Sequence, residues 1–264
     1  MTELAKKLNL DEKLVIKLSE LNGSDVTSLA DECLQKGFTA LKKKNDVLRL
    51  AVILECAKRA VADYEKKGIP LEIFYHTMSD IRIWCDNNEG RGLKNYGWLK
   101  NHVNCELFRL GRLQFQIYEC RNRTLLYNKL PFACGEKLIY VHIPQGEKLS
   151  EEECRKSFLM AEEFFSKFFP DYDYRYYFCE SWLLYEGNKD FMKPDSNIVR
   201  FMNMFNHAYS VKIDSQAVSR IFGKRRLLKK NYPETTSLQK SAKAYMQKGG
   251  KLGVGIGYID KSRF

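Results

Sequence analysis

Residues 138–168 read LIYVHIPQGEKLSEEECRKSFLMAEEFFSKF and join an apolar segment to a polar loop and a long amphipathic segment. The apolar run Leu138 to Ile143 predicts a strand. Ser150 with Glu153 three residues later has the spacing of a capping box, and Pro170 ends the helical pattern. The stretch therefore predicts a strand, a loop and a helix in succession.

The loop of this stretch, from Gln145 to Lys148, has the residues of an anion site. Free backbone N–H groups ahead of a helix attract negative charge, and Gly146 permits a close approach to the backbone. An ordinary connection between a strand and a helix has the same pattern. Spacing alone therefore leaves a phosphate site and a plain loop as alternatives.

Reactive side chains occur on two predicted strands. Alternation places His142 on the face of Tyr140, where it is either a base or a structurally hydrogen-bonded histidine. Glu180 lies among aromatic residues and is either a base with a raised pKa or a solvent-facing acid. Cys179 or Ser181 as a nucleophile would need a base that the sequence does not place.

Helical patterns fill the first hundred residues, and strands join them afterwards. At Gly111, within LFRLGRLQFQIY (107–118), the apolar alternation changes phase, which predicts a β-bulge in one continuous strand. Further strands are expected at 123–128, 138–143, 174–185 and 252–259. Helices are expected at 25–44, at 46–68, from Pro70 through Trp84, and at 93–103, 150–168, 196–206, 214–223 and 237–247.

This order predicts an α+β protein with two domains. We expect a helical N-terminal domain over 1–103 and a mixed, largely antiparallel sheet flanked by helices over 104–264. In the last strand, Gly253, Gly255 and Gly257 leave one face without side chains, so a packed helix or a slender ligand approaches the backbone there.

The composition is that of a folded chain, with 44% hydrophobic residues in 264 and a net charge of +11. Residues 220–264 hold twelve Lys or Arg against Glu234 and Asp260, so this segment alone contributes +10. The excess favours an anionic partner, or it is a solvated basic face. In the basic run Gly223 to Lys230 no aromatic residue interleaves with the cations, so we do not expect nucleic acid as the partner.

Absent sequence features lead to expectations about the cellular location and about the state of the cysteines. It has no apolar run of membrane-spanning length, and Met1 to Leu10 lacks the apolar core of a secretory signal. We therefore expect a cytoplasmic protein with no membrane partner. The two nearest of the eight cysteines are fourteen positions apart, so we expect reduced thiols and no metal site.

Six blocks in fixed order resemble the acyltransferase domain-containing family, which has a helical N-terminal N-acyltransferase domain and a GNAT-like C-terminal domain. They span nearly the whole chain: TMSDIRIW (77–84), GLKNYGWLKNHV (92–103), FRLGRLQF (108–115), HIPQGEKLSEEECRKSF (142–158), FCESWLL (178–184) and DSNIVRF (195–201).

The resemblance implies a fold in which a bulged strand, a loop and a helix hold the pyrophosphate of coenzyme A, while the pantetheine lies in a splay between two strands. Leu138 to Ile143 then matches the bulged fourth strand, Gln145 to Lys148 the pyrophosphate loop, and Tyr174 to Tyr185 the fifth strand. The basic segment would suit the adenosine phosphates.

The chain departs from the GNAT pattern at two places. Of the motif [QR]-x-x-G-x-[GA], only Gln145 and Gly146 remain. Met204 stands seven residues after Asn197, where GNAT enzymes commonly have the tyrosine that protonates the departing thiolate. Tyr185, Tyr209 or solvent would replace it, or catalysis is absent.

The resemblance thus implies an N-acyltransferase that moves an acyl group, expected to be acetyl, from coenzyme A to a primary amine. The expected co-substrate is acetyl-CoA or another acyl-CoA. Its candidate binding residues are Ile143, Gln145, Gly146, Glu147 and Lys148, and the candidate bases are Glu119, His142 and Glu180. The alternatives are a non-catalytic GNAT-like module that binds acyl-CoA, a nucleotide or a protein, and a basic RNA-associated protein.

Overall fold

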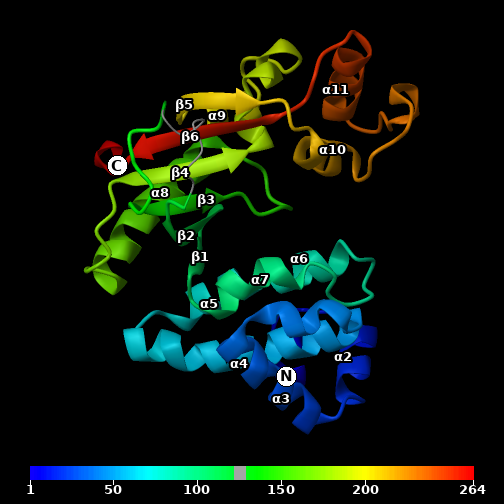
Figure 1. The fold of residues 1–264 in the computed structure, drawn as a ribbon, viewed down its shortest axis with the longest axis vertical. Helices are drawn as coiled ribbons and strands as arrows, with labels where there is room; N and C mark the ends of the chain where they lie inside the picture. The colour runs from blue at the N-terminus through cyan, green and yellow to red at the C-terminus, as the bar shows by residue number, and fades with distance from the viewer. Residues whose placement is uncertain (122–128) are drawn as a thin grey trace. The chain divides into compact units, whose positions relative to one another are not determined.

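The computed structural model describes residues 1–121 and 129–264, and these form two compact units (Figure 1). The first comprises Met1–Gln116, Ile143–Glu147 and Glu163–Pro170; the second comprises Ile117–His142, Lys148–Glu162 and Asp171–Phe264. The strand expected at 123–128 lies outside the described residues. The domain boundary expected at 103/104 stays a prediction.

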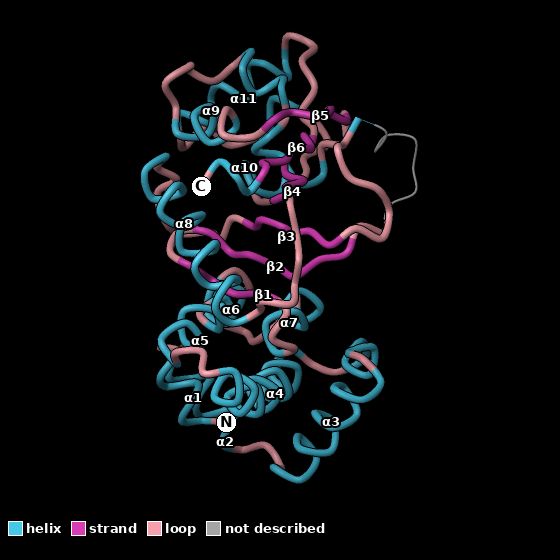
Figure 2. The backbone as a smooth tube through the Cα atoms, turned by 90° about the vertical axis from the view of Figure 1, so that its left-hand side faces the viewer, coloured by secondary structure: helices cyan, strands magenta, loops and turns pink. Residues whose placement is uncertain are grey.

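The first unit is built around one long helix, α4 (Asp46–Lys67), whose Leu50 to Leu54 are all fully buried. Asn45 caps its start and Gly68, in the left-handed region, ends it. Figure 2 shows α1, α2, α4 and α5 gathered side by side. The other helices of this unit are α1 (Thr2–Lys7), α2 (Glu12–Ser19), α3 (Gly23–Lys36), α5 (Leu71–Met78), α6 (Asp80–Asp86) and α7 (Tyr96–Val103).

Two predicted helices are interrupted. The helix expected over 25–44 ends at Lys36, because Gly37 has a φ of 88°, and a 3-10 helix (Phe38–Lys43) follows. The helix expected after Pro70 is divided at Ser79 into α5 and α6. The Ser79 hydroxyl donates a 2.6 Å hydrogen bond to the carbonyl of His76, a back-bond that disturbs the regular helix.

The predicted β-bulge at Gly111 is wrong, because Gly111 and Arg112 form the turn of a hairpin. Strand β1 (Leu107–Leu110) pairs antiparallel with β2 (Leu113–Glu119), with Leu110 opposite Leu113. Of the two turn residues only Gly111 has a positive φ, 66°, which is the pattern of a type II′ turn. The hairpin therefore reverses the chain where one continuous strand was expected.

The strands form one six-stranded mixed sheet in the order β1-β2-β3-β4-β6-β5. Strand β3 (Lys137–His142) runs parallel to β4 (Tyr176–Ser181), whereas β6 (Val254–Asp260) lies antiparallel between β4 and β5 (Asn206–Val211). Figure 1 draws β3, β4, β6 and β5 as neighbouring arrows. The helices of this part of the chain are α8 (Glu151–Phe168), α9 (Asn197–Met202), α10 (Ser215–Phe222) and α11 (Ser237–Gln247).

Helix α8 covers one face of the sheet and so fixes which residues lie on the other. In the second unit, Phe158 packs edge-on against Tyr177, with ring centres 5.0 Å apart, and the Tyr177 hydroxyl donates a 2.6 Å hydrogen bond to Glu162. Tyr177 and Cys179 therefore face α8. By alternation, Phe178 and Glu180 face the opposite side of β4.

Near the end of the chain the structure adds one strand that was not predicted, and it shows what approaches the glycines of the last strand. The helix expected over 196–206 ends at Met202, and β5 follows. A Cβ on Gly255 would strike the backbone of Leu184, and a Cβ on Gly253 the carbonyl of Val211. The glycines of the last strand therefore admit neighbouring protein backbone, which excludes a ligand from that space.

Candidate functional site

Two buried arginines from the β1–β2 hairpin hold the loop that follows β3. The Arg112 guanidinium donates to the carbonyl of Pro144 at 3.0 Å and to the carbonyl of Glu147 at 2.8 Å. Arg109 donates to the Glu147 carboxylate. Arg109 is 9% and Arg112 5% exposed, whereas the Glu147 side chain is 58% exposed. The bonds of Arg112 to the two carbonyls are therefore the ones shielded from water, and they fix the path of the loop.

Arg112 binds carbonyl oxygens of the loop and does not occupy the backbone amides of the loop. These amides remain available to another acceptor. The amides of Gln145, Gly146 and Glu147 donate no hydrogen bond to any residue that the structure describes. Gly146 has a φ of 109°, and no atom lies within 4 Å of the position a Cβ would take. Successive exposed amides around a glycine of positive φ are typical of an anion-binding nest.

Helical residues of the first unit hold the same loop and its arginines. The Asn87 side-chain amide donates to Oε1 of Gln145 at 3.1 Å. Arg109 donates through its guanidinium to the Ser79 hydroxyl at 3.1 Å and through its backbone amide to Thr77 at 2.9 Å. Ser79, at the break between α5 and α6, thus supplies a hydroxyl that helps to orient the side chain of Arg109.

In the second unit, the parallel pair β3–β4 is joined over a short length only. The register pairs Ile139 with Tyr177 and Tyr140 with Phe178. Both strands then continue past these two pairs, β3 to His142 and β4 to Ser181. We call this stretch, beyond the second pair, the strand opening.

Two of the three candidate bases lie beside this opening, on the face of the sheet away from α8. The ring of His142 stacks on that of Tyr140, with centres 4.1 Å apart, which confirms the face predicted for it. The Tyr140 hydroxyl donates to the carbonyl of Glu180 at 3.4 Å. Tyr140 therefore connects the strand of His142 with that of Glu180, and both side chains are partly exposed.

Phenols near Glu180 remain protonated. Burial raises the pKa of Tyr118, and the charge of Glu180 raises it further. Burial likewise raises the pKa of Tyr209, again with a contribution from Glu180. Tyr209, one of the residues considered as a substitute for the tyrosine missing at Met204, therefore lies within the electrostatic reach of a candidate base. Met204 is itself buried at 3% exposure.

The third candidate base lies elsewhere. Glu119 is exposed, and alternation along β2 turns it away from the face of Tyr118. Its charge acts on Tyr172, whose hydroxyl donates to the carbonyls of Tyr118 and Leu138. The structure therefore does not bring Glu119 together with His142 and Glu180.

The remaining reactive groups considered on β4 and after it are held by packing. Cys179 is fully buried, and burial raises the pKa of its thiol, so the thiolate that a nucleophile requires is suppressed. Ser181 accepts a hydrogen bond from the amide of Leu183 at the start of a 3-10 helix. Tyr185, another candidate acid, is 6% exposed, with its ring against Gly253.

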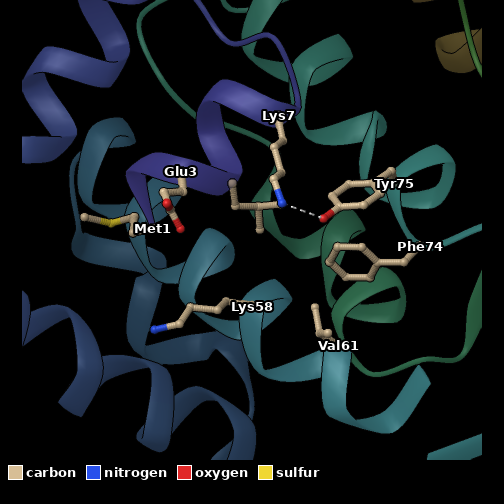
Figure 3. Close-up of a pocket in the computed structure, with 8 residues that line it drawn as sticks. Met1, Glu3, Lys7, Lys58, Val61, Phe74 and Tyr75 are labelled. Atoms are coloured by element: carbon tan, nitrogen blue, oxygen red, sulfur yellow. Dashed lines mark hydrogen bonds between the residues drawn. The ribbon is translucent and has the colours of Figure 1, made fainter. Parts of the chain in front are cut away.

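A pocket of about 270 Å³ occurs among the helices of the first unit (Figure 3). Lys7, Tyr75, Lys58 and Phe74 are among its lining residues, and the Lys7 ammonium donates to the Tyr75 hydroxyl at 3.2 Å. None of the candidate site residues lines it. We take the loop with its exposed amides as the candidate anion site of the first unit, and the strand opening with its ionisable side chains as the candidate reactive region of the second.

Sequence reasoning missed Arg109 and Arg112 as residues of the site. The signal was present, because both arginines lie close to Gly111 and between the apolar residues Leu107, Phe108, Leu110 and Leu113. Their targets lie more than thirty residues further along the chain.

Fold and site together define a class, that of GNAT-like proteins with a helical N-terminal region. The model of the GNAT-like C-terminal domain matches residues 107–259, and that of the N-acyltransferase N-terminal domain matches residues 1–105. The chain belongs to this family of acyltransferases. No curated protein matches it.

Solved structures share the fold at low sequence identity. An acyltransferase in complex with decanoyl-CoA and teicoplanin superimposes with a TM-score of 0.81 at 18% identity. A mutant acyltransferase in complex with octanoyl-CoA gives 0.82 at 18% identity, and an acyltransferase with CoA and 10C-teicoplanin gives 0.81 at 17%. In each case the match covers 98% of this chain and 86% of the other.

Proposed function

We propose that the protein is an acyl-CoA-dependent N-acyltransferase that transfers an acyl group to a primary amine. The observation that carries the proposal is the loop at Gln145 to Glu147, whose carbonyls are held by Arg112 and whose amides donate to no described residue. Diphosphate is an anion that such a nest binds. Family membership supports coenzyme A as its source.

The pantetheine would extend along the ends of β3 and β4, beyond their second pair. Its thioester would then lie beside His142 and Glu180. The amine nitrogen attacks the thioester carbonyl, the new C–N bond forms as the C–S bond breaks, and coenzyme A leaves as the thiolate. His142 or Glu180 takes the proton that the amine loses.

The departing thiolate needs a proton, and Tyr209 is our proposed donor. Its phenol keeps its proton because burial and Glu180 raise its pKa. Most of the acceleration in such a direct attack comes from holding amine and thioester together, so a donor at the usual sequence position is not essential. The loss of tyrosine at Met204 is therefore compatible with catalysis.

The acyl group and the acceptor are the finer parts of the proposal. Acetyl was the expectation from resemblance, whereas structures of the same fold hold octanoyl-CoA and decanoyl-CoA. Beside the opening, the partly exposed rings of Tyr118 and Tyr140 are in contact, and they offer apolar surface to a longer chain. We propose acyl groups longer than acetyl as the better donors.

An acyl-transfer assay tests the activity itself. Purified protein would be incubated with acetyl-, octanoyl- or decanoyl-CoA and a panel of primary amines, with release of free thiol and acylated product both followed. Amine-dependent thiol release supports the proposal. Saturable binding of every donor without product from any amine would favour the non-catalytic module instead.

A further inference from the structure

The two most exposed large apolar side chains of the described residues, Leu227 and Ile213, both occur in the second unit. Leu227 is 98% exposed and Ile213 60%, and Leu228 beside Leu227 is 49% exposed. Scattered exposed leucines are normal, but adjacent ones on a projecting loop indicate an interaction surface.

Two hydrogen bonds connect the loop from Lys224 to Lys230, which carries Leu227 and Leu228, to the rest of the unit. Arg225 binds Asp214 at 2.5 Å, which ties the loop to the turn that bears Ile213. On the other side, the Lys229 ammonium donates to the carbonyl of Met246, at the end of α11, at 2.7 Å. Leu227 therefore lies on a loop that is fastened on both sides, and its exposure is part of the fold.

Cations surround the exposed leucines. Lys224, Arg226 and Lys230 are exposed, and none of them makes a hydrogen bond or an ion pair with another residue in the described part of the chain. Arg225 and Lys229 are used by the fold, whereas these three charges are available to an outside anion. The surface therefore combines projecting apolar groups with unneutralised positive charge.

We propose that Ile213 and the loop from Lys224 to Lys230 form a docking surface for an anionic lipid bilayer. The three apolar side chains would enter the boundary between headgroups and acyl chains, and the three free cations would lie against lipid phosphates. RNA offers phosphates but no apolar phase for Leu227, and the loop has no aromatic residue on which bases stack.

This proposal revises the expectation of no membrane partner. That expectation rested on the lack of a membrane-spanning segment, and no helix among the described residues has the length and apolarity to cross a bilayer. A surface that lies on the bilayer needs no such helix. Hydropathy along the sequence does not reveal it, because only the structure shows which leucines project.

Vesicle flotation of the full chain tests the proposal. Wild-type protein should bind vesicles of phosphatidylcholine with phosphatidylglycerol, bind those of phosphatidylcholine alone weakly, and dissociate partly at high salt. Each cation near an anionic surface contributes about fivefold in partitioning, so Lys224→Gln, Arg226→Gln and Lys230→Gln combined should lower binding more than tenfold. Leu227→Ser with Leu228→Ser should also lower it at least tenfold.

Matched variants separate the surface from general charge and apolarity. Lys240→Gln, Lys248→Gln and Lys251→Gln remove the same charge from the same basic segment, and Leu159→Ser with Met160→Ser removes exposed apolar groups from α8. Both control proteins should bind as wild type, with thermal melting confirming that all variants fold. Absence of wild-type binding, or leucine variants that bind undiminished, would overturn the proposal. If wild type binds poly(U), and the variant lacking the three cations loses that binding while the leucine variant keeps it, RNA is the partner instead.

Discussion

The guanidinium of Arg112 donates a 2.8 Å hydrogen bond to the backbone carbonyl of Glu147, thirty-five residues later in the chain. Through this bond the hairpin turn sets the direction in which the amides of the loop point. The chemistry of the proposed cofactor site is therefore determined by a residue that need not touch the cofactor.

Replacement of Arg112 by methionine should weaken binding of coenzyme A at least tenfold. The change keeps an unbranched apolar stem but removes the donors to Pro144 and Glu147, and it should cost about 1–3 kcal/mol of stability. Calorimetric titration and thermal melting measure the two effects. Arg82→Met, at a half-exposed ion pair of the same unit, is the control; equal losses in both proteins would contradict this role.

Replacement of Glu147 by glutamine should strengthen binding of coenzyme A by about three- to tenfold. The Glu147 carboxylate now neutralises Arg109, and it would repel an incoming diphosphate. The side-chain amide removes the repulsion while the backbone amide stays. Titration at low salt measures the gain, with Glu152→Gln on the exposed face of α8 as the control. Weaker binding by Glu147→Gln would show that the carboxylate holds the loop in its binding form.

Substitution of the three candidate bases should separate them by their effect on kcat. Either His142 or Glu180 accepts the proton from the amine. Substitution of that residue, by His142→Asn or Glu180→Gln, should lower kcat by a factor on the order of a hundred or more, with acyl-CoA binding little changed. Glu119→Gln should behave as wild type, because Glu119 lies away from both. A large loss of kcat in the Glu119 variant alone would contradict this arrangement.

Acid should destabilise the first unit through Asp80. Burial opposes the ionised carboxylate of Asp80, but hydrogen bonds with His102, Trp98 and Gln114 outweigh it and hold the pKa below its usual value. A lowered pKa in the folded state gives stability that is present above the ordinary value near 4 and is lost as the pH falls through the folded value.

Asp80→Asn should therefore cost about 3 kcal/mol at neutral pH and flatten the loss of stability below about pH 5. Urea unfolding as a function of pH measures both quantities. Asp86→Asn, at an exposed carboxylate of the same helix, should keep the wild-type acid profile. If the Asp80 variant loses stability in acid as wild type does, other carboxylates cause the acid destabilisation and the role given to Asp80 is wrong.

Local patterns predicted most helices and the strand-loop-helix stretch, because caps and periodicity act over a few residues. The turn at Gly111 shows the limit of this reasoning. A bulge and a two-residue hairpin shift the apolar alternation by the same single step, so the sequence cannot separate them. Only the pairing of Leu110 with Leu113 decides.

The sequence did not predict features that depend on contacts between residues far apart in the chain. Strand β5 lies at the edge of the sheet, and its residues from His207 to Val211 are all half-buried, so it shows neither alternation nor an apolar run. Arg109 and Arg112 stand out in the sequence as arginines among apolar residues, but their role depends on a loop that folding brings to them. Local patterns supplied the loop, the resemblance supplied its expected ligand, and the structure added the residues that hold it.

Calorimetric titration with coenzyme A and acyl-CoA, on wild type, Gly146→Glu and Gly135→Glu, tests whether the loop at Gly146 binds the co-substrate. Both glycines are exposed, have positive φ and leave open space for a Cβ, so backbone strain is matched between the two variants. We expect saturable binding to wild type and Gly135→Glu that is lost in Gly146→Glu. Equal binding by all three proteins, or none by wild type, would contradict it.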